Sequence, residues 1–179
     1  MLTFSHSRPP RNSVLPEPDA NEPIRLARMA ATHAGRGEIS EAMRCYQLAL
    51  LTDESRPDLW VNYGILQARV GLLNDALESF EFALGLDATM YMARYRIGRV
   101  CYELGRPLEA LANFRIVTHL RPAYAPAWRY LVQLTWALGD HDEADALACE
   151  GLKHAQGDEE LESLRERVAQ DRAEADAEN

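Results

Sequence analysis

The side chains best suited to binding a partner are arginines and aromatic rings in two short stretches, residues 95–102 and 129–136. Guanidinium groups and amphipathic rings carry much of the binding energy in protein interfaces, because they make large contacts at a low entropic cost. The residues concerned are Tyr95, Arg96, Arg99, Tyr102, Arg129, Tyr130 and Trp136. Their chemistry indicates a surface that binds another molecule.

No pattern indicates catalysis or a metal centre. Histidines His33, His119 and His141 stand alone, without the i, i+4 pairing or neighbouring carboxylates that a metal site needs. The three cysteines have no C-x2-C spacing, so we expect free thiols that are partly buried. A Gly-rich phosphate loop and a G-x-S-x-G nucleophile elbow are both missing. We therefore expect no enzyme activity, no cofactor and no metal.

A 34-residue period positions these residues. Four series of small or aromatic residues return one period apart: Gly37, Gly71, Gly105, Gly139; Ala42, Ala76, Ala110, Ala144; and Tyr46, Phe80, Phe114, closed by Ala148. A period of this length indicates stacked units, each of which buries its apolar face only against its neighbours. The units are 23–56, 57–90, 91–124 and 125–158.

Each unit is expected to hold two amphipathic helices, A and B, separated by a glycine at position 15 of the repeat. In the second unit, helix A would span about 57–70 and helix B about 73–86. Position 8 is small in three units and position 20 is always alanine, so the two helices can approach closely.

The second unit carries the motifs W-x2-[YL]-G and A-x3-[FY]-x2-A in Trp60, Tyr63, Gly64, and in Ala76, Phe80, Ala83. With four consecutive copies, the chain resembles the tetratricopeptide repeat family. The resemblance implies an all-α, right-handed α-solenoid of four helix-turn-helix units. Arg94 departs from the pattern, since an apolar residue is expected there.

The two ends differ from the repeats. Residues 1–22 are Pro-rich, without a signal peptide or transmembrane pattern, and are expected to be disordered. Leu161, Leu164 and Val168 form a narrow apolar stripe that predicts a capping helix over 159–172. Residues 173–179 read as a disordered acidic tail. The small residues Ala148 and Gly151 could leave an apolar strip on the fourth unit for a partner helix.

The resemblance implies a concave groove lined by positions 2, 5, 6, 9, 12 and 13 of each A helix. The candidate groove residues are Asn62, Arg69, Tyr95, Arg96, Arg99, Tyr102, Arg129, Tyr130, Gln133 and Trp136. An alternative is that the rings pack against the next repeat while the arginines face solvent.

A net charge of −9 argues against a nucleic-acid partner, because phosphate binding needs a basic footprint. More than half of the excess acid lies beyond residue 158, so the groove can still be basic. An acidic or carboxylate-bearing peptide would suit it. Asn62 and Arg96 match two of the five positions of the family's carboxylate clamp, while Ala27, Ala31 and Met92 depart from it.

These features predict a cytoplasmic, non-catalytic adaptor or co-chaperone that binds a peptide segment of a partner protein in the groove. In size and charge the chain resembles small tetratricopeptide chaperones of bacterial secretion systems, although those have three repeats. The alternative is a structural assembly subunit that self-associates, or docks on an enzyme or secretion complex, through its convex face or ends. Neither hypothesis involves nucleic acid or a membrane.

Overall fold

A computed structural model describes residues 21–178, with side chains as far as 174, and this part of the chain contains nine α-helices and no strand. The helices are α1 Glu22–Gly35, α2 Ile39–Thr52, α3 Pro57–Arg69, α4 Leu73–Leu86, α5 Tyr91–Glu103, α6 Pro107–Leu120, α7 Ala125–Ala137, α8 His141–His154 and α9 Glu159–Glu178. The expected all-α solenoid is confirmed. The expected disorder of residues 1–22 falls almost wholly outside the described residues.

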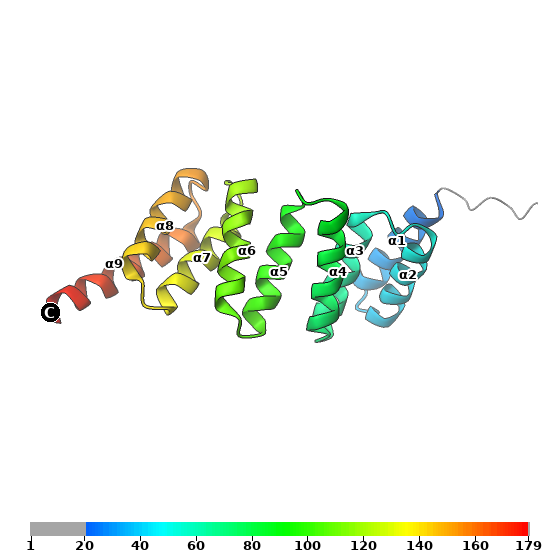
Figure 1. The fold of residues 1–179 in the computed structure, drawn as a ribbon, viewed down its shortest axis with the longest axis horizontal. Helices are drawn as coiled ribbons and strands as arrows, with labels where there is room; N and C mark the ends of the chain where they lie inside the picture. Colours follow the sequence, from blue (N-terminus) through cyan, green and yellow to red (C-terminus); the bar gives the residue numbers. More distant parts are fainter. Residues whose placement is uncertain (1–20, 179) are drawn as a thin grey trace, which may run out of the picture.

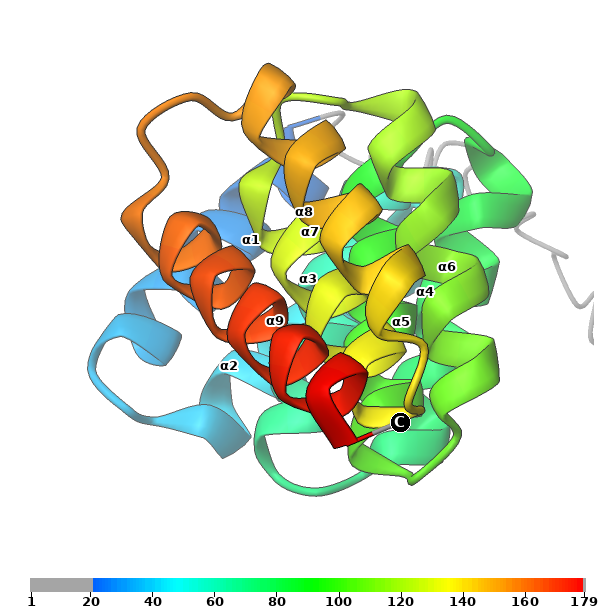
Figure 2. The ribbon, with the colours of Figure 1, turned by 90° about the vertical axis from the view of Figure 1, so that its left-hand side faces the viewer.

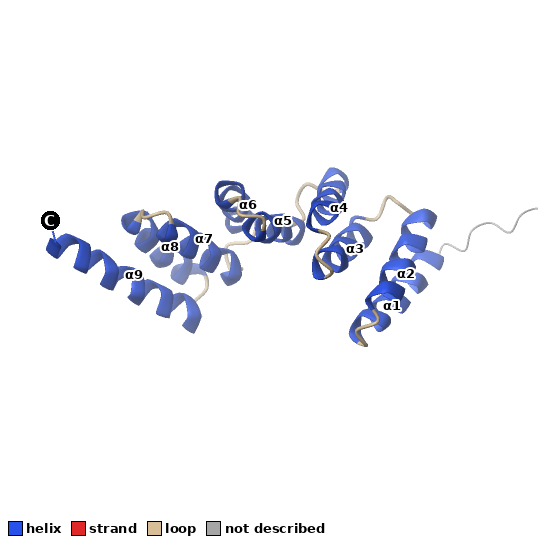
Figure 3. Cartoon of the chain, turned by 90° about the horizontal axis from the view of Figure 1, so that it is seen from below, coloured by secondary structure: helices blue, strands red, loops and turns tan. Residues whose placement is uncertain are grey.

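The helices stack in sequence order into an elongated row (Figure 1). The strongest packing is within the pairs α1/α2, α3/α4, α5/α6 and α7/α8, and each B helix then packs on the next A helix. The row is curved, with the A helices α1, α3, α5 and α7 on its inner side and the B helices on its outer side (Figure 3). Side chains on the A helices therefore line one continuous concave face.

Glycine closes the turn between helices A and B in every unit. Gly37, Gly71, Gly105 and Gly139 have φ angles of 79°, 83°, 71° and 89°. This left-handed conformation strains any residue with a Cβ, so the periodic glycine marks the end of each A helix.

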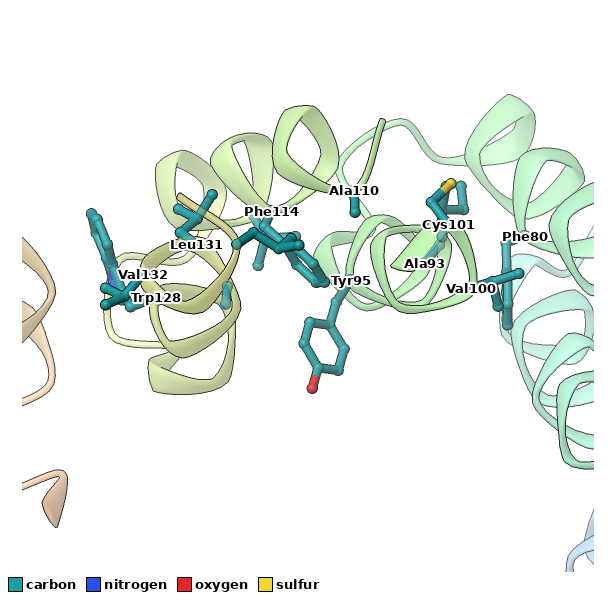
Figure 4. Close-up of a cluster of buried hydrophobic side chains, with 14 of the residues drawn as sticks. Phe80, Ala93, Tyr95, Val100, Cys101, Ala110, Phe114, Trp128, Leu131 and Val132 are labelled. Atoms are coloured by element: carbon teal, nitrogen blue, oxygen red, sulfur yellow. The ribbon is translucent and has the colours of Figure 1, made fainter. Parts of the chain in front are cut away.

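In the second and third units, position 8 of helix A meets position 24 of helix B. A Cβ on Gly98 would lie 2.8 Å from Cε1 of Phe114, and one on Gly64 would lie 2.8 Å from Cε1 of Phe80. In the fourth unit the sizes are reversed, with Val132 at position 8 and Ala148 at position 24, both fully buried. The paired sizes thus keep the core filled across the units (Figure 4).

Helix α9 covers the C-terminal end of the row and packs on both α8 and α7 (Figure 2). Leu161, Leu164 and Val168 are buried, as the apolar stripe predicts. A Cβ on Gly151 would lie 2.9 Å from Leu161 Cδ2 and equally close to Trp128 Cγ. The open apolar strip expected at Ala148 and Gly151 is therefore wrong, because α9 itself fills it.

The helix also runs further than expected. Residues 173–178, predicted as a disordered acidic tail, continue α9 to Glu178. The stretch is rich in Ala and Glu, which have high helix propensity, and Gln170 Nε2 donates a hydrogen bond to Glu174 Oε1 one turn on. Helix propensity alone supports these turns without an apolar face.

Candidate arginine cavity on the concave face

Helices α3 and α5 enclose a small cavity bordered by three of the predicted arginines. Arg69 comes from the last residue of α3, and Arg96 and Arg99 come from successive turns of α5. The cavity measures about 200 Å³, and its apolar lining consists of Ile65, Ala68, Phe80 and Val100. An apolar floor beneath a guanidinium rim strengthens a charged hydrogen bond, because water is partly excluded.

The cavity carries more positive than negative charge. Its one acidic residue, Glu103, lies 3.5 Å from Arg99, with both side chains well exposed, so this pair is weak. No described residue forms an ion pair with Arg69 or Arg96. The Nε atom of Arg96 is buried and has no hydrogen-bond partner in the described chain. An acceptor that paired with this donor would offset its desolvation cost.

A second hollow, of about 380 Å³, lies further along the same face between α5, α7 and α9. It is lined by Tyr95, Pro126, Arg129, Tyr130, Gln133 and Glu160. Gln133 is exposed here and makes no hydrogen bond with another described residue. Arg129, in contrast, forms ion pairs with Glu160 of α9 and with Asp158, 3.5 Å away, in the loop before α9.

The tyrosines form a ring cluster between the third and fourth units. Tyr130 stacks on Phe114 with centroids 4.8 Å apart, and Tyr95 meets Tyr124 edge to face at 5.0 Å. Burial raises the pKa of the Tyr95 hydroxyl. Tyr130 thus packs on the preceding unit, whereas Tyr95 packs on Tyr124 of its own unit and, with centroids 6.1 Å apart, on Tyr130 of the next. Tyr102 remains 49% exposed.

Helix α9 occupies the last part of the concave face. The indole Nε1 of Trp136 donates a hydrogen bond of 2.9 Å to Asp171 Oδ2, and the Arg167 guanidinium lies 4.8 Å from the centroid of the Trp136 ring system. Trp136 and Arg129 thus already have partners within the chain.

Over the described residues, no three His, Cys, Asp or Glu side chains gather closely enough to hold a metal ion. None of the helices in this part of the chain is long and apolar enough to cross a bilayer.

No family model matches the chain. Two curated proteins are similar to part of it. Mouse Superkiller complex protein 3 is 27% identical over 107 residues, which is 60% of this chain and 7% of that protein. The tetratricopeptide repeat and J domain-containing co-chaperone DNJ1 of Fusarium oxysporum f. sp. lycopersici is 28% identical over 117 residues, 63% of this chain and 22% of that protein. The match therefore spans under a quarter of either relative.

Several solved structures share the fold. A MamA protein superposes with a TM-score of 0.71 at 21% identity, covering 85% of this chain and 88% of that one. YrrB, described as a TPR protein with an unusual peptide-binding site, gives 0.70 at 19% identity over 87% and 80%. The first TPR of Spaghetti (RPAP3), bound to the HSP90 peptide SRMEEVD, gives 0.65 at 23% identity over 68% and 96%. This chain has the tetratricopeptide repeat fold.

On this fold, eight of the ten predicted groove residues divide into three groups. Arg69, Arg96 and Arg99 meet at the cavity of α3 and α5. Tyr95, Arg129, Tyr130 and Gln133 line the second hollow, whereas Trp136 lies under α9. Tyr102 touches Tyr130 edge to face at 5.7 Å, and Asn62 is half-buried on α3 without a hydrogen bond to another described residue.

Sequence reasoning missed the residues of α9 that reach the concave face. Glu160, Arg167 and Asp171 look like the solvated face of a capping helix, yet each contacts a groove residue. No local signal distinguishes them from neighbouring charges. Their spacings of seven and four residues, which place them on one face of α9, were the available clue.

Proposed function

We propose that this protein is a non-catalytic interaction module, an adaptor or co-chaperone, that binds an acidic peptide segment at the arginine cavity of α3 and α5. The observation that carries the proposal is the set of three arginines, Arg69, Arg96 and Arg99, around one cavity that contains a single carboxylate. An acidic side chain or a C-terminal carboxylate of the peptide would neutralise this excess.

The chemistry of the cavity favours a carboxylate over other acceptors. A guanidinium presents a planar pair of donors that matches the two oxygens of a carboxylate. Such a contact would be strengthened by the apolar residues that line the cavity, and it would be stronger still if it reached the unpaired Nε of Arg96. A volume of about 200 Å³ suits one side chain or chain terminus, so neighbouring peptide residues would lie along the open face.

Other predicted groove residues on the A helices suit that extended contact. Tyr102 offers a half-exposed ring, and Asn62 and Gln133 offer amide groups that can hydrogen-bond to a peptide backbone. The related fold of the Spaghetti TPR, with its bound peptide SRMEEVD, supports an acidic peptide as the class of ligand. Three of the five clamp positions here are apolar, so we propose a different set of contacts, centred on Arg69, Arg96 and Arg99.

Affinity capture from lysate tests the proposal, with wild type beside Arg96→Glu/Arg99→Glu. A matched control is Arg36→Glu/Arg44→Glu, because both residues are exposed, lie outside the cavity and give the same change in net charge. Mass spectrometry should find proteins retained by wild type and the control but lost from the cavity variant. Identical capture by all three proteins would overturn the proposal.

The assembly-subunit hypothesis makes a different prediction. Ile24 and Met29 of α1 are 44% and 46% exposed at the N-terminal end of the described row. If this end pairs with a second copy, the molar mass measured by light scattering will rise with concentration, and Met29→Ser will keep the chain monomeric. A constant monomer mass would exclude self-association and leave the adaptor function. We propose that the adaptor acts in the cytoplasm.

A further inference from the structure

The convex face carries an apolar stripe that the concave-face proposal does not use. Its residues lie on three successive B helices and all remain exposed. They are Leu48 and Leu51 on α2, Phe82 and Leu86 on α4, and Ile116 and Leu120 on α6, with exposed fractions from 38% to 83%. We call these six residues the convex stripe. Leu48, Phe82 and Ile116 stand one period apart, as do Leu86 and Leu120. A contiguous apolar surface of this kind marks an interaction site more often than chance.

The stripe is hollowed where α2, α3 and α4 meet. One shallow cavity of about 520 Å³ is lined by Glu78, Glu81, Phe82, Gly85 and Leu86, and another of about 400 Å³ is lined by Gln47, Leu50, Leu51, Glu54, Trp60 and Tyr63. Trp60 stacks on Phe82 with ring centroids 4.8 Å apart. Because Trp60 lines one cavity and Phe82 lines the other, the two cavities are neighbours, and we call them together the trough.

The rim of the trough is acidic. Glu54, Glu78 and Glu81 form no ion pair with any described residue, and α4 contains three carboxylates but no basic side chain. Two copies of this surface facing each other would bring like charges together, which disfavours a symmetric dimer here. Lysines or arginines beside an apolar face would complement the same rim.

Gly85 leaves room for close approach. A Cβ placed on it meets nothing within 4 Å, so the fold itself gives no steric reason for glycine in α4. Glycine costs roughly 1 kcal/mol relative to alanine inside a helix. The bare backbone beside Phe82 and Leu86 lets another helix lie close to α4.

We propose that the convex stripe is a second binding surface, which accepts an amphipathic helix whose apolar face is flanked by lysine or arginine. Leucine-sized side chains of that helix fill the trough around the Trp60–Phe82 stack, and its basic residues pair with Glu54, Glu78 and Glu81. This is recognition of a helix in a groove by i, i+3, i+4 and i+7 anchors. The surface is separate from the arginine cavity, so its occupancy does not depend on concave-face binding.

A designed peptide tests this surface directly. The probe is a fluorescein-labelled helix of about 18 residues, with leucine at i, i+3, i+4 and i+7 and lysine elsewhere. One control peptide has the same composition in scrambled order, and another has glutamate in place of lysine. Fluorescence polarisation should detect binding of the amphipathic Leu/Lys peptide to the full chain, and much weaker binding of both controls.

Protein variants then locate the site. Phe82→Ser should weaken binding by about tenfold or more, as expected for a central aromatic anchor, and Glu78→Gln/Glu81→Gln should weaken it and reduce its salt dependence. Arg96→Gln/Arg99→Gln should leave it unchanged. Because Phe82 is 61% exposed, its replacement should preserve the fold, and thermal unfolding checks this. Equal binding of scrambled and amphipathic peptides, or no loss in Phe82→Ser, would overturn the proposal.

Discussion

The two parts of the concave face use similar residues differently. In the fourth unit, Arg129 pairs with Glu160 and Trp136 donates its hydrogen bond to Asp171, so α9 occupies that part of the face. In the third unit, Arg96 has no such partner, and the ring of Tyr102 is half-exposed. Arginine and aromatic residues are therefore bound within the fold at one place and are available at the other.

The occupied part indicates what the open part can bind. Helix α9 opens with three glutamates in its first turn and reaches the face through acidic side chains at both ends of the contact. The chain itself thus provides an example of an acidic segment held by arginine and an indole ring. An acidic partner at the arginine cavity would repeat that chemistry between molecules.

The largest expected effect is at the anchor of α9. Leu161→Ala should destabilise the protein by about 2 to 5 kcal/mol, because Leu161 is fully buried against Gly151. Urea unfolding followed by tryptophan fluorescence measures this. The control Leu108→Ala removes a leucine that is 71% exposed and should change little. Equal effects for the two variants would mean that α9 is not an integral part of the core.

The next effect compares packing in the two regions. Gly98→Ala should cost about 1 to 3 kcal/mol through overpacking, because its Cβ would lie 2.8 Å from the buried Phe114 ring. Val132→Ala, at the same position of the fourth unit, should cost a similar amount by leaving a cavity. Urea unfolding tests both. A stabilising Gly98→Ala would show that the A and B helices can move apart at no cost.

These helix contacts were largely predictable from the sequence. Helix α4 spans the expected 73–86, and α3 ends one residue before the expected position 70. The reason is that both features depend on single local residues. Glycine at position 15 specifies the turn, and alanine at position 20 allows the close contact between helices A and B. The roles of Arg129 and Arg96 could not be separated in this way, because the difference lies in α9, more than 20 residues away along the chain.

The tyrosines show the same limit. Tyr95 and Tyr102 lie on the expected side of α5, yet Tyr95 is 8% exposed and Tyr102 49%. The difference depends on the rings nearby, because Tyr95 meets both Tyr124, at the end of its own unit, and Tyr130 of the next unit, whereas Tyr102 meets Tyr130. Periodicity predicts the face on which a side chain lies, whereas its burial depends on contacts between units.

A smaller effect separates the two arginine environments by stability. Arg129→Gln should cost about 1 kcal/mol, because it leaves Glu160 and Asp158 without their partner on a partly covered surface. Arg99→Gln removes one exposed pair with Glu103 and should cost less than about 0.5 kcal/mol. Chemical denaturation of both variants gives the comparison, and an equal cost would contradict the distinction.

The smallest effect concerns the turns before the second and third units. Asp53 accepts hydrogen bonds from the amide and hydroxyl of Ser55, and Asp87 accepts the same pair from Thr89. The hydroxyl bonds are the main cause that lowers the pKa of each carboxyl below its ordinary value of 3.8. The turn before the fourth unit has Arg121 at the equivalent position.

Because the folded pKa is lowered, the stabilisation is fully present above pH 3.8 and is lost as pH falls through the lower folded pKa. Asp53→Asn/Asp87→Asn should therefore be less stable than wild type at pH 6, and the gap should narrow below pH 3.8. Urea unfolding across this range is the measurement. A gap that stays constant with pH would exclude the carboxylates as its source.

Arginine side-chain NMR tests the central claim most directly. An acidic peptide with a free C-terminus is titrated into labelled protein while the Nε–Hε signals of Arg96, Arg99 and Arg129 are followed, each assigned by its Arg→Lys variant. Our account predicts saturable shifts for Arg96 and Arg99, with Arg129 unmoved because α9 already holds it. Shifts at Arg129 alone, or no shift at Arg96 and Arg99, would contradict it.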